Sequence, residues 1–131
     1  MAVLTLWAAL WTVPTSDASV QGLATYYAPG LMEEVAANRG MGGLPAGYAG
    51  MVALNRMGDL RRSVWLEREG EVTGPYRVVD CAGRGGHFED RERRGLVVEV
   101  AWELGQAWGM QGPVPVVVYF EPPLPEGRVM L

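Results

Sequence analysis

The chain has 131 residues, 49% of them hydrophobic, which suffices for one hydrophobic core and leaves no material for a second. Its 18 glycines and 9 prolines favour short strands joined by tight turns over a helical bundle. Eleven arginines, no lysine and fifteen acidic residues give a net charge of −4, and the scattered arginines form no basic stripe of the kind that nucleic-acid binding requires.

The first segment of the chain reads as a secretory leader. Residues 2–13 carry no charge, are too few to cross a bilayer comfortably, and are followed by Pro14 and small residues at Ser16 and Ala18. We therefore predict a signal peptide at 1–18 and a secreted, extracytoplasmic protein with no membrane span once the leader is removed. The alternatives are a membrane anchor or a misassigned start.

The rest of the chain reads as one β-rich domain, 19–121, with a Pro-rich tail, 122–131. Runs of β-forming residues bounded by turn residues predict strands at 22–27, 51–54, 63–67, 76–80, 96–100 and 113–120. Helical spacing predicts short helices at 31–39 and 101–109. Surface loops are predicted at 40–50 and 82–95, and turns at 69–71 and 73–75.

Three short motifs occur in a characteristic order. They lie at residues 22–27 (GLATYY), 78–80 (VVD) and 98–101 (VEVA), the last followed by the predicted helix. In this order they resemble the G-x-A-S-Y-Y, V-N-D and I-D-L-S motifs of the rare lipoprotein A and expansin barrels, and the resemblance covers residues 22–120. It implies a mainly β fold, a six-stranded double-psi β-barrel with one or two short helices, and a role at the cell wall.

Two acidic residues in these motifs are candidates for chemistry. Asp80 ends an apolar strand and precedes small residues that would leave a groove open beside it. Burial there would raise the pKa of the Asp80 carboxyl and make it a general acid and base, with Glu99 in support, as glycan cleavage requires. The alternatives are that Asp80 caps a turn through its own backbone, and that Glu99 binds N–H groups at the start of the following helix.

Other side chains are candidates for gripping a sugar. Flat aromatic rings suit the apolar faces of sugars, and strand alternation predicts that only one of the two adjacent tyrosines faces a groove. Asn55 stands where the bacterial barrels have a groove histidine, as Glu99 stands where they have an aspartate. The candidate substrate-binding residues are Tyr26, Tyr27, Asn55, Tyr48 and Trp102.

The polar segment 82–95 and the single cysteine have simpler interpretations. His87 reads as a solvated loop histidine, and Arg84, Arg91, Arg93 and Arg94 read as a surface neutralised by the acids between them. One histidine and one cysteine form no metal-binding constellation, so we expect no metal and no cofactor. The lone Cys81 lies far from the N-terminus, which argues against a lipid anchor, and it has no partner for an internal disulfide.

Together the resemblance and these residues imply a monomeric domain that binds or loosens peptidoglycan or a related wall polysaccharide. One alternative is a lytic transglycosylase that cleaves peptidoglycan strands with Asp80 as general acid and base. Another is a structural or protein-binding barrel without glycan activity. The sequence leaves open whether the protein is an enzyme.

Overall fold

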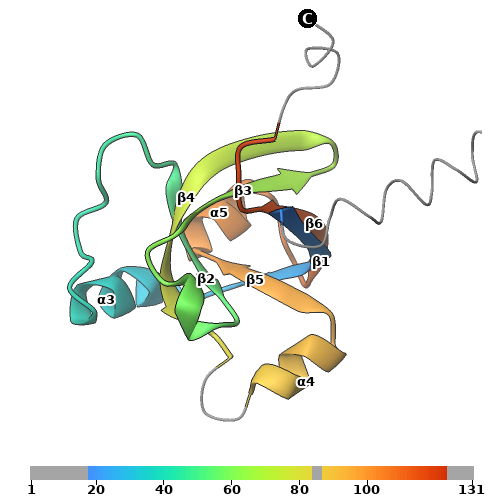
Figure 1. The fold of residues 1–131 in the computed structure, drawn as a ribbon, viewed down its shortest axis with the longest axis horizontal. Coiled ribbons are helices and arrows are strands. Elements are labelled where there is room, and N and C mark those ends of the chain that lie inside the picture. The colour runs from blue at the N-terminus through green and yellow to red at the C-terminus, as the bar shows by residue number, and fades with distance from the viewer. Residues whose placement is uncertain (1–17, 84–86, 124–131) are drawn as a thin grey trace, which may run out of the picture.

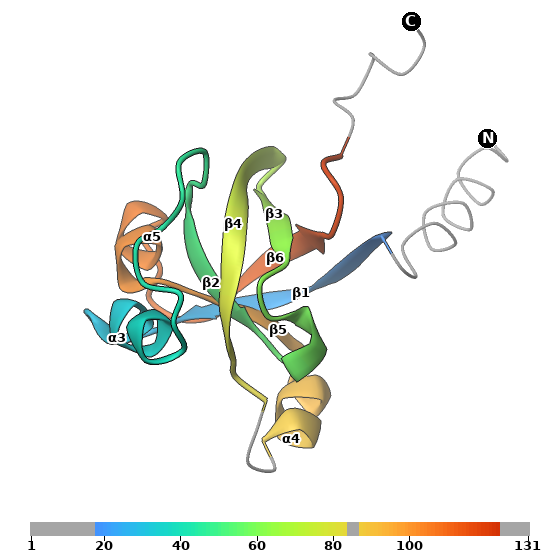
Figure 2. The same cartoon turned by 60° about the vertical axis from the view of Figure 1, so that its left-hand side comes forward.

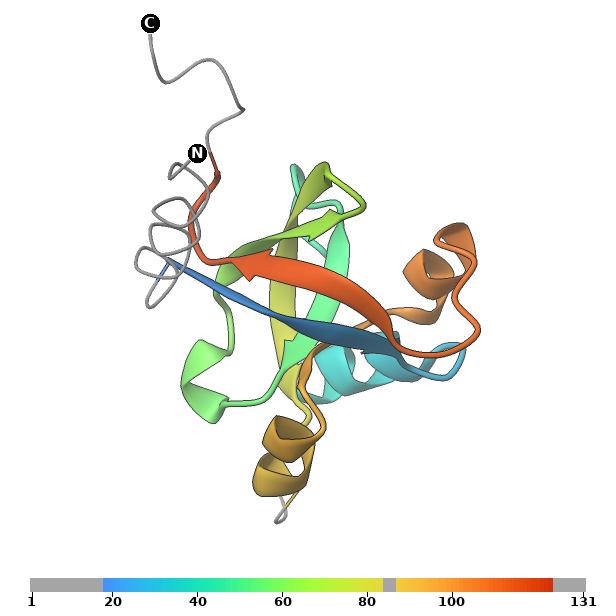
Figure 3. The same ribbon diagram turned by 90° about the vertical axis from the view of Figure 1, so that its right-hand side faces the viewer.

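A closed barrel of six strands forms the body of the molecule (Figures 1 and 3). The computed structural model describes residues 18–83 and 87–123, so the predicted leader and most of the tail lie outside the described residues. The barrel order is β1-β5-β2-β4-β3-β6. The strands are β1 (Ser19–Tyr26), β2 (Gly50–Leu54), β3 (Ser63–Arg68), β4 (Glu71–Cys81), β5 (Leu96–Val100) and β6 (Val114–Tyr119).

The strand pairing has an internal two-fold pattern that the sequence does not reveal. β1 pairs with β5 and β2 with β4 in parallel, and the other four ladders are antiparallel. Exchanging β1, β2 and β3 for β4, β5 and β6 reproduces the same set of pairs. The predicted mainly β, six-stranded barrel is confirmed, and its connectivity is compatible with a double-psi barrel.

Three α-helices and one 3₁₀ turn accompany the strands in the described residues. α3 (Leu31–Asn38) and α5 (Trp102–Ala107) were predicted and lie beside the same end of the barrel, whereas α4 (Phe88–Arg93) lies at a different end (Figure 2). The 3₁₀ turn η1 (Met57–Asp59) follows β2. No helix in 18–83 or 87–123 combines the length and the apolar character that a membrane crossing needs.

Two local predictions are wrong. Residues 82–95 were predicted as a loop but contain α4, whose one buried residue is Arg91, so no apolar spacing marks the helix. Residues 73–75 were predicted as a turn but lie inside β4, where the ladder with β3 shifts register between Val64 and Leu66. A Cβ at Gly74 would lie 2.9 Å from the Trp65 ring, and the φ of +135° also requires glycine, so this glycine serves a bulge and not a turn.

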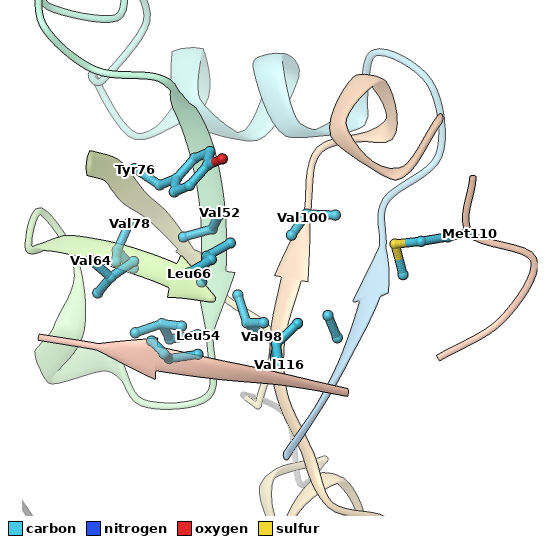
Figure 4. Close-up of a cluster of buried hydrophobic side chains, with 12 residues drawn as sticks. Val52, Leu54, Val64, Leu66, Tyr76, Val78, Val98, Val100, Met110 and Val116 are labelled. Carbon is cyan, nitrogen blue, oxygen red and sulfur yellow. The ribbon is translucent and has the colours of Figure 1, made fainter. Parts of the chain in front are cut away.

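Two groups of buried side chains fill and flank the barrel. The inner core occupies the barrel interior (Figure 4) and consists of Ala24, Val52, Leu54, Val64, Leu66, Tyr76, Val78, Val98, Val100, Met110, Val116 and Val118. The outer cluster contains side chains of α3 together with barrel residues: Tyr27, Met32, Ala36, Met41, Ala53, Val79 and Ala101. The outer cluster fixes α3 against the barrel, and the candidate site forms beside it.

Candidate functional site

A register shift in the β2/β4 ladder determines where Asp80 points. Val52 pairs with Val78 and Ala53 pairs with Asp80, so Val79 is the extra residue of a β-bulge. Strict alternation from Val78, which faces the inner core, would send the Asp80 side chain into the barrel interior. Because Asp80 instead lies opposite Ala53, a member of the outer cluster, it takes the outer face under α3.

Glu99 reaches the same face from the neighbouring ladder. It pairs with Ala53 on β2 and with Thr25 on β1, so Ala53 lies between the two acids. The backbones of Asp80 and Glu99 are therefore two strand spacings apart, about 10 Å.

Both acids line one open pocket of about 410 Å³, which also brings the two adjacent tyrosines together. The expectation that only one of those tyrosines would line the groove is wrong. β1 ends at Tyr26, so Tyr27 lies beyond the strand and is free of its alternation, although the two rings pack on different clusters. The lining residues are Tyr26, Tyr27, Ala28, Leu31, Asp80, Cys81, Ala82, His87 and Glu99.

Asp80 is held by three side-chain hydrogen bonds and is only 4% exposed. Its Oδ2 accepts a bond of 2.6 Å from the Tyr27 hydroxyl, and its Oδ1 accepts bonds of 3.1 and 2.9 Å from Nε and Nη2 of Arg39. Burial by itself raises the pKa of the carboxyl. The bonds from Tyr27, the Cys81 backbone N–H and Arg39, with the Arg39 charge, outweigh burial and lower the pKa below its ordinary value.

The predicted rise in the pKa of Asp80 is therefore wrong, because the sequence showed the burial but not the partners. An ionised Asp80 has no proton to give to a glycosidic oxygen at neutral pH. Burial, followed by the hydrogen bond and the charge of Asp80, also raises the pKa of Tyr27 far above its ordinary value. The tyrosine hydroxyl thus remains the donor in this pair.

Glu99 is the more accessible carboxylate of the pocket, with 20% of its side chain exposed. Its Oε2 accepts a hydrogen bond of 2.9 Å from Thr25 Oγ1. Its Oε1 lies 3.7 Å from Nη1 of Arg91, an ion pair without a short hydrogen bond. Glu99 accepts its hydrogen bond from Thr25, and within the described residues α5 has no side-chain cap at its start. The alternative that Glu99 caps this helix is therefore wrong.

Arg91 projects from α4 into a buried polar network and is 8% exposed. Its Nε donates to Asn55 Oδ1 over 2.6 Å. Asn55 Nδ2 donates to the Leu96 carbonyl over 2.9 Å and to Glu92 Oε2 over 3.3 Å. The prediction of a solvated surface residue is wrong for Arg91, because this helix turns it inward toward Asn55.

The remaining arginines and Cys81 complete the surroundings. Arg93 and Arg94 both pair with Asp90 at the surface, as predicted, and Arg84 lies outside the described residues. The Cys81 thiol is buried and donates to the Asn55 carbonyl over 3.2 Å. Cys81 is therefore a buried packing residue, and it is the one cysteine in the sequence.

The other predicted binding residues lie elsewhere. Asn55 is buried and lines a second pocket of about 250 Å³ beside η1. Tyr48 shares a hydrogen bond of 2.7 Å with Ser63, and Trp102 is half-buried at the start of α5. Neither of those two aromatic residues is among the residues that line the pocket of Asp80.

The sequence reasoning missed Arg39 and the place of His87 at the pocket. Arg39 follows a short helix 41 residues before Asp80, so no local spacing connects the two. His87 is exposed, as predicted, but it lines the pocket of the two acids. Within the described residues, no group of three or more metal-ligating side chains could hold a metal ion.

The fold and the pocket define a closed six-stranded barrel, compatible with a double-psi barrel, with an open pocket that two carboxylates and two tyrosines help to line. Comparison with models of known families, with curated proteins and with solved structures gives no match. The likeness to rare lipoprotein A and the expansins therefore rests on the motifs of the chain and on its barrel.

Proposed function

We propose that this domain is exported and binds or loosens peptidoglycan or a related wall polysaccharide, as a monomer. The single observation behind the proposal is the open pocket in which Asp80 and Glu99 lie beside Tyr26 and Tyr27. Carboxylate oxygens accept hydrogen bonds from sugar hydroxyls, and aromatic rings suit the apolar faces of sugar rings. The apolar run at residues 2–13 supports export.

Binding agrees with the state of Asp80 better than catalysis does. A general acid must hold a proton near neutral pH, whereas the partners of Asp80 lower its pKa. An Asp80 held ionised accepts hydrogen bonds and cannot donate a proton, so the pocket is better equipped to hold a glycan than to protonate it.

A lytic transglycosylase is the second candidate, because both carboxylates line one pocket. In that case Asp80 would lose its bond to Arg39 when substrate binds, and Glu99 would assist from the neighbouring ladder. If the pocket binds no glycan, the third candidate remains, a structural or protein-binding barrel.

One experiment separates the three functions. The purified protein is incubated with insoluble peptidoglycan, chitin and cellulose, and both the pelleted protein and the soluble fragments are measured. Binding without fragments supports the proposal. Fragments that disappear in Asp80→Asn, in protein whose circular dichroism shows it still folded, support the enzyme. Absence of both from all three polymers contradicts any polysaccharide function. Glu103→Gln, an exposed charge change outside the pocket, is the control.

A further inference from the structure

The charges around the pocket are arranged in two layers. Asp80 and Glu99 line it, whereas Arg39 and Arg91, the arginines that pair with them, are not among the lining residues. The polar side chains that line the pocket are therefore two carboxylates and two tyrosines, with the exposed His87 beside them. Tyr27 adds an acceptor to this lining, because its hydrogen is given to Asp80 and its oxygen can only accept.

The two carboxylates differ in what they can still bind. Both oxygens of Asp80 already accept side-chain hydrogen bonds, and the residue is 4% exposed. Oε1 of Glu99 has its nearest described cation at 3.7 Å, beyond a hydrogen bond, in a side chain that is 20% exposed. Covering that oxygen with a group that cannot donate would remove its water and leave it without a hydrogen bond, which costs free energy even beside Arg91. A ligand that fills the pocket must therefore donate a hydrogen bond to Glu99.

We propose that this donor is the protonated amine of a de-N-acetylated amino sugar, so that the pocket prefers glucosamine units over N-acetylglucosamine units. The inference rests on the proposed polysaccharide function. Any N–H that donates to a carboxylate makes a charge-assisted hydrogen bond, but an ammonium group adds an opposite charge to that bond, which a neutral acetamide lacks. The acetyl group also adds an acceptor oxygen to a pocket whose reachable charge is already an acceptor. The net charge of −4 favours the approach of a cationic chain.

The test compares two oligosaccharides of equal length, a glucosamine tetramer and its fully N-acetylated counterpart. Binding to the full chain is measured by calorimetry at about pH 6, where amines are protonated and carboxylates are ionised. We expect the wild type to bind the glucosamine tetramer at least about tenfold more tightly, as the gain from the added charge of the ammonium group. The preference should shrink as salt is raised.

The variants assign the preference to one residue. Glu99→Gln keeps the shape and removes the charge, so the preference should fall to within about twofold, while the control Glu103→Gln should retain it. A wild type that binds the N-acetylated tetramer equally or more tightly overturns the inference and leaves the polysaccharide function standing. A preference that survives in Glu99→Gln overturns it as well. If neither tetramer binds and the insoluble polymers also fail to pellet the protein, the proposed function fails together with it.

Discussion

Replacing Arg39 with methionine should destabilise the barrel, because Arg39 anchors the buried Asp80. Its Nε and Nη2 donate two hydrogen bonds to Oδ1, and with Asp80 4% exposed water cannot take their place. Removing one partner of a buried ion pair costs about 3–5 kcal/mol. The side chain of Arg39 is 20% exposed, so we expect a loss near the lower end, about 3 kcal/mol. Methionine retains part of the apolar stem.

Urea unfolding measures this loss directly. A small domain has an m value of about 1.5 kcal/mol per molar urea, so the midpoint should fall by about 2 M. Asp80→Asn and the double variant complete a cycle. We expect the double variant to be less damaged than the sum of the single variants by about 2 kcal/mol, because the unpaired charge is absent.

The pH dependence of the free energy of unfolding tests the same Arg39–Asp80 ion pair independently. Since the folded pKa of Asp80 is lowered, its contribution is present above the unfolded pKa of about 3.9 and is lost as the pH falls through the folded value. In Arg39→Met burial is less opposed and the folded pKa of Asp80 lies closer to the unfolded value, so the loss on acidification should be smaller and complete at a higher pH than in the wild type. A midpoint shift below about 0.5 M with an unchanged pH profile would refute the anchoring role of Arg39.

Three further substitutions test the surroundings of the pocket. Tyr27→Phe removes the 2.6 Å hydrogen bond to Asp80 and should lower the free energy of unfolding in urea by about 2 kcal/mol, less than Arg39→Met. An equal or larger loss would contradict the conclusion that Arg39 contributes more to stability than Tyr27. Arg91→Met leaves the buried Asn55 Oδ1 without its donor and removes the cation nearest to Glu99, so we expect about 3 kcal/mol of destabilisation; unchanged stability would exclude a structural role for the network. Gly83→Ala places a Cβ against the Asn55 carbonyl oxygen and should lower the thermal midpoint through a loss of about 2 kcal/mol; wild-type stability would show that this turn can move.

The strands were predictable from the sequence because their residues alternate toward one core. In β5, for example, Val98 and Val100 face the inner core and Glu99 between them faces out, as period-2 alternation requires. Where tertiary contacts overrode the local signal, the prediction failed. Gly74 looks like a turn residue but makes room for Trp65, and the polar helix α4 buries an arginine instead of an apolar stripe.

The candidate site was predictable in part of its membership and not in its electrostatics. Asp80 and Glu99 were expected beside one groove, and the structure places both in one pocket. The sign of the Asp80 pKa shift depends on Arg39 and Tyr27, which reach it across 41 and 53 residues of chain. Side-chain partners at such separations leave no periodic trace in one sequence, so burial alone gave the wrong direction.

The different states of the two carboxylates follow from the strands that carry them. The bulge at Val79 turns Asp80 outward under α3, where Arg39, directly after that helix, and the tyrosine after β1 can saturate it. Glu99 has no such cover: its neighbour Thr25 occupies one oxygen, and Arg91 approaches the other only to 3.7 Å. A charge that is already satisfied stabilises the fold, whereas a charge with an unused acceptor position attracts a ligand. If the pocket recognises a glycan, Glu99 is therefore the residue whose removal should change which sugar binds, and Asp80 the residue whose removal should change whether the barrel stays folded.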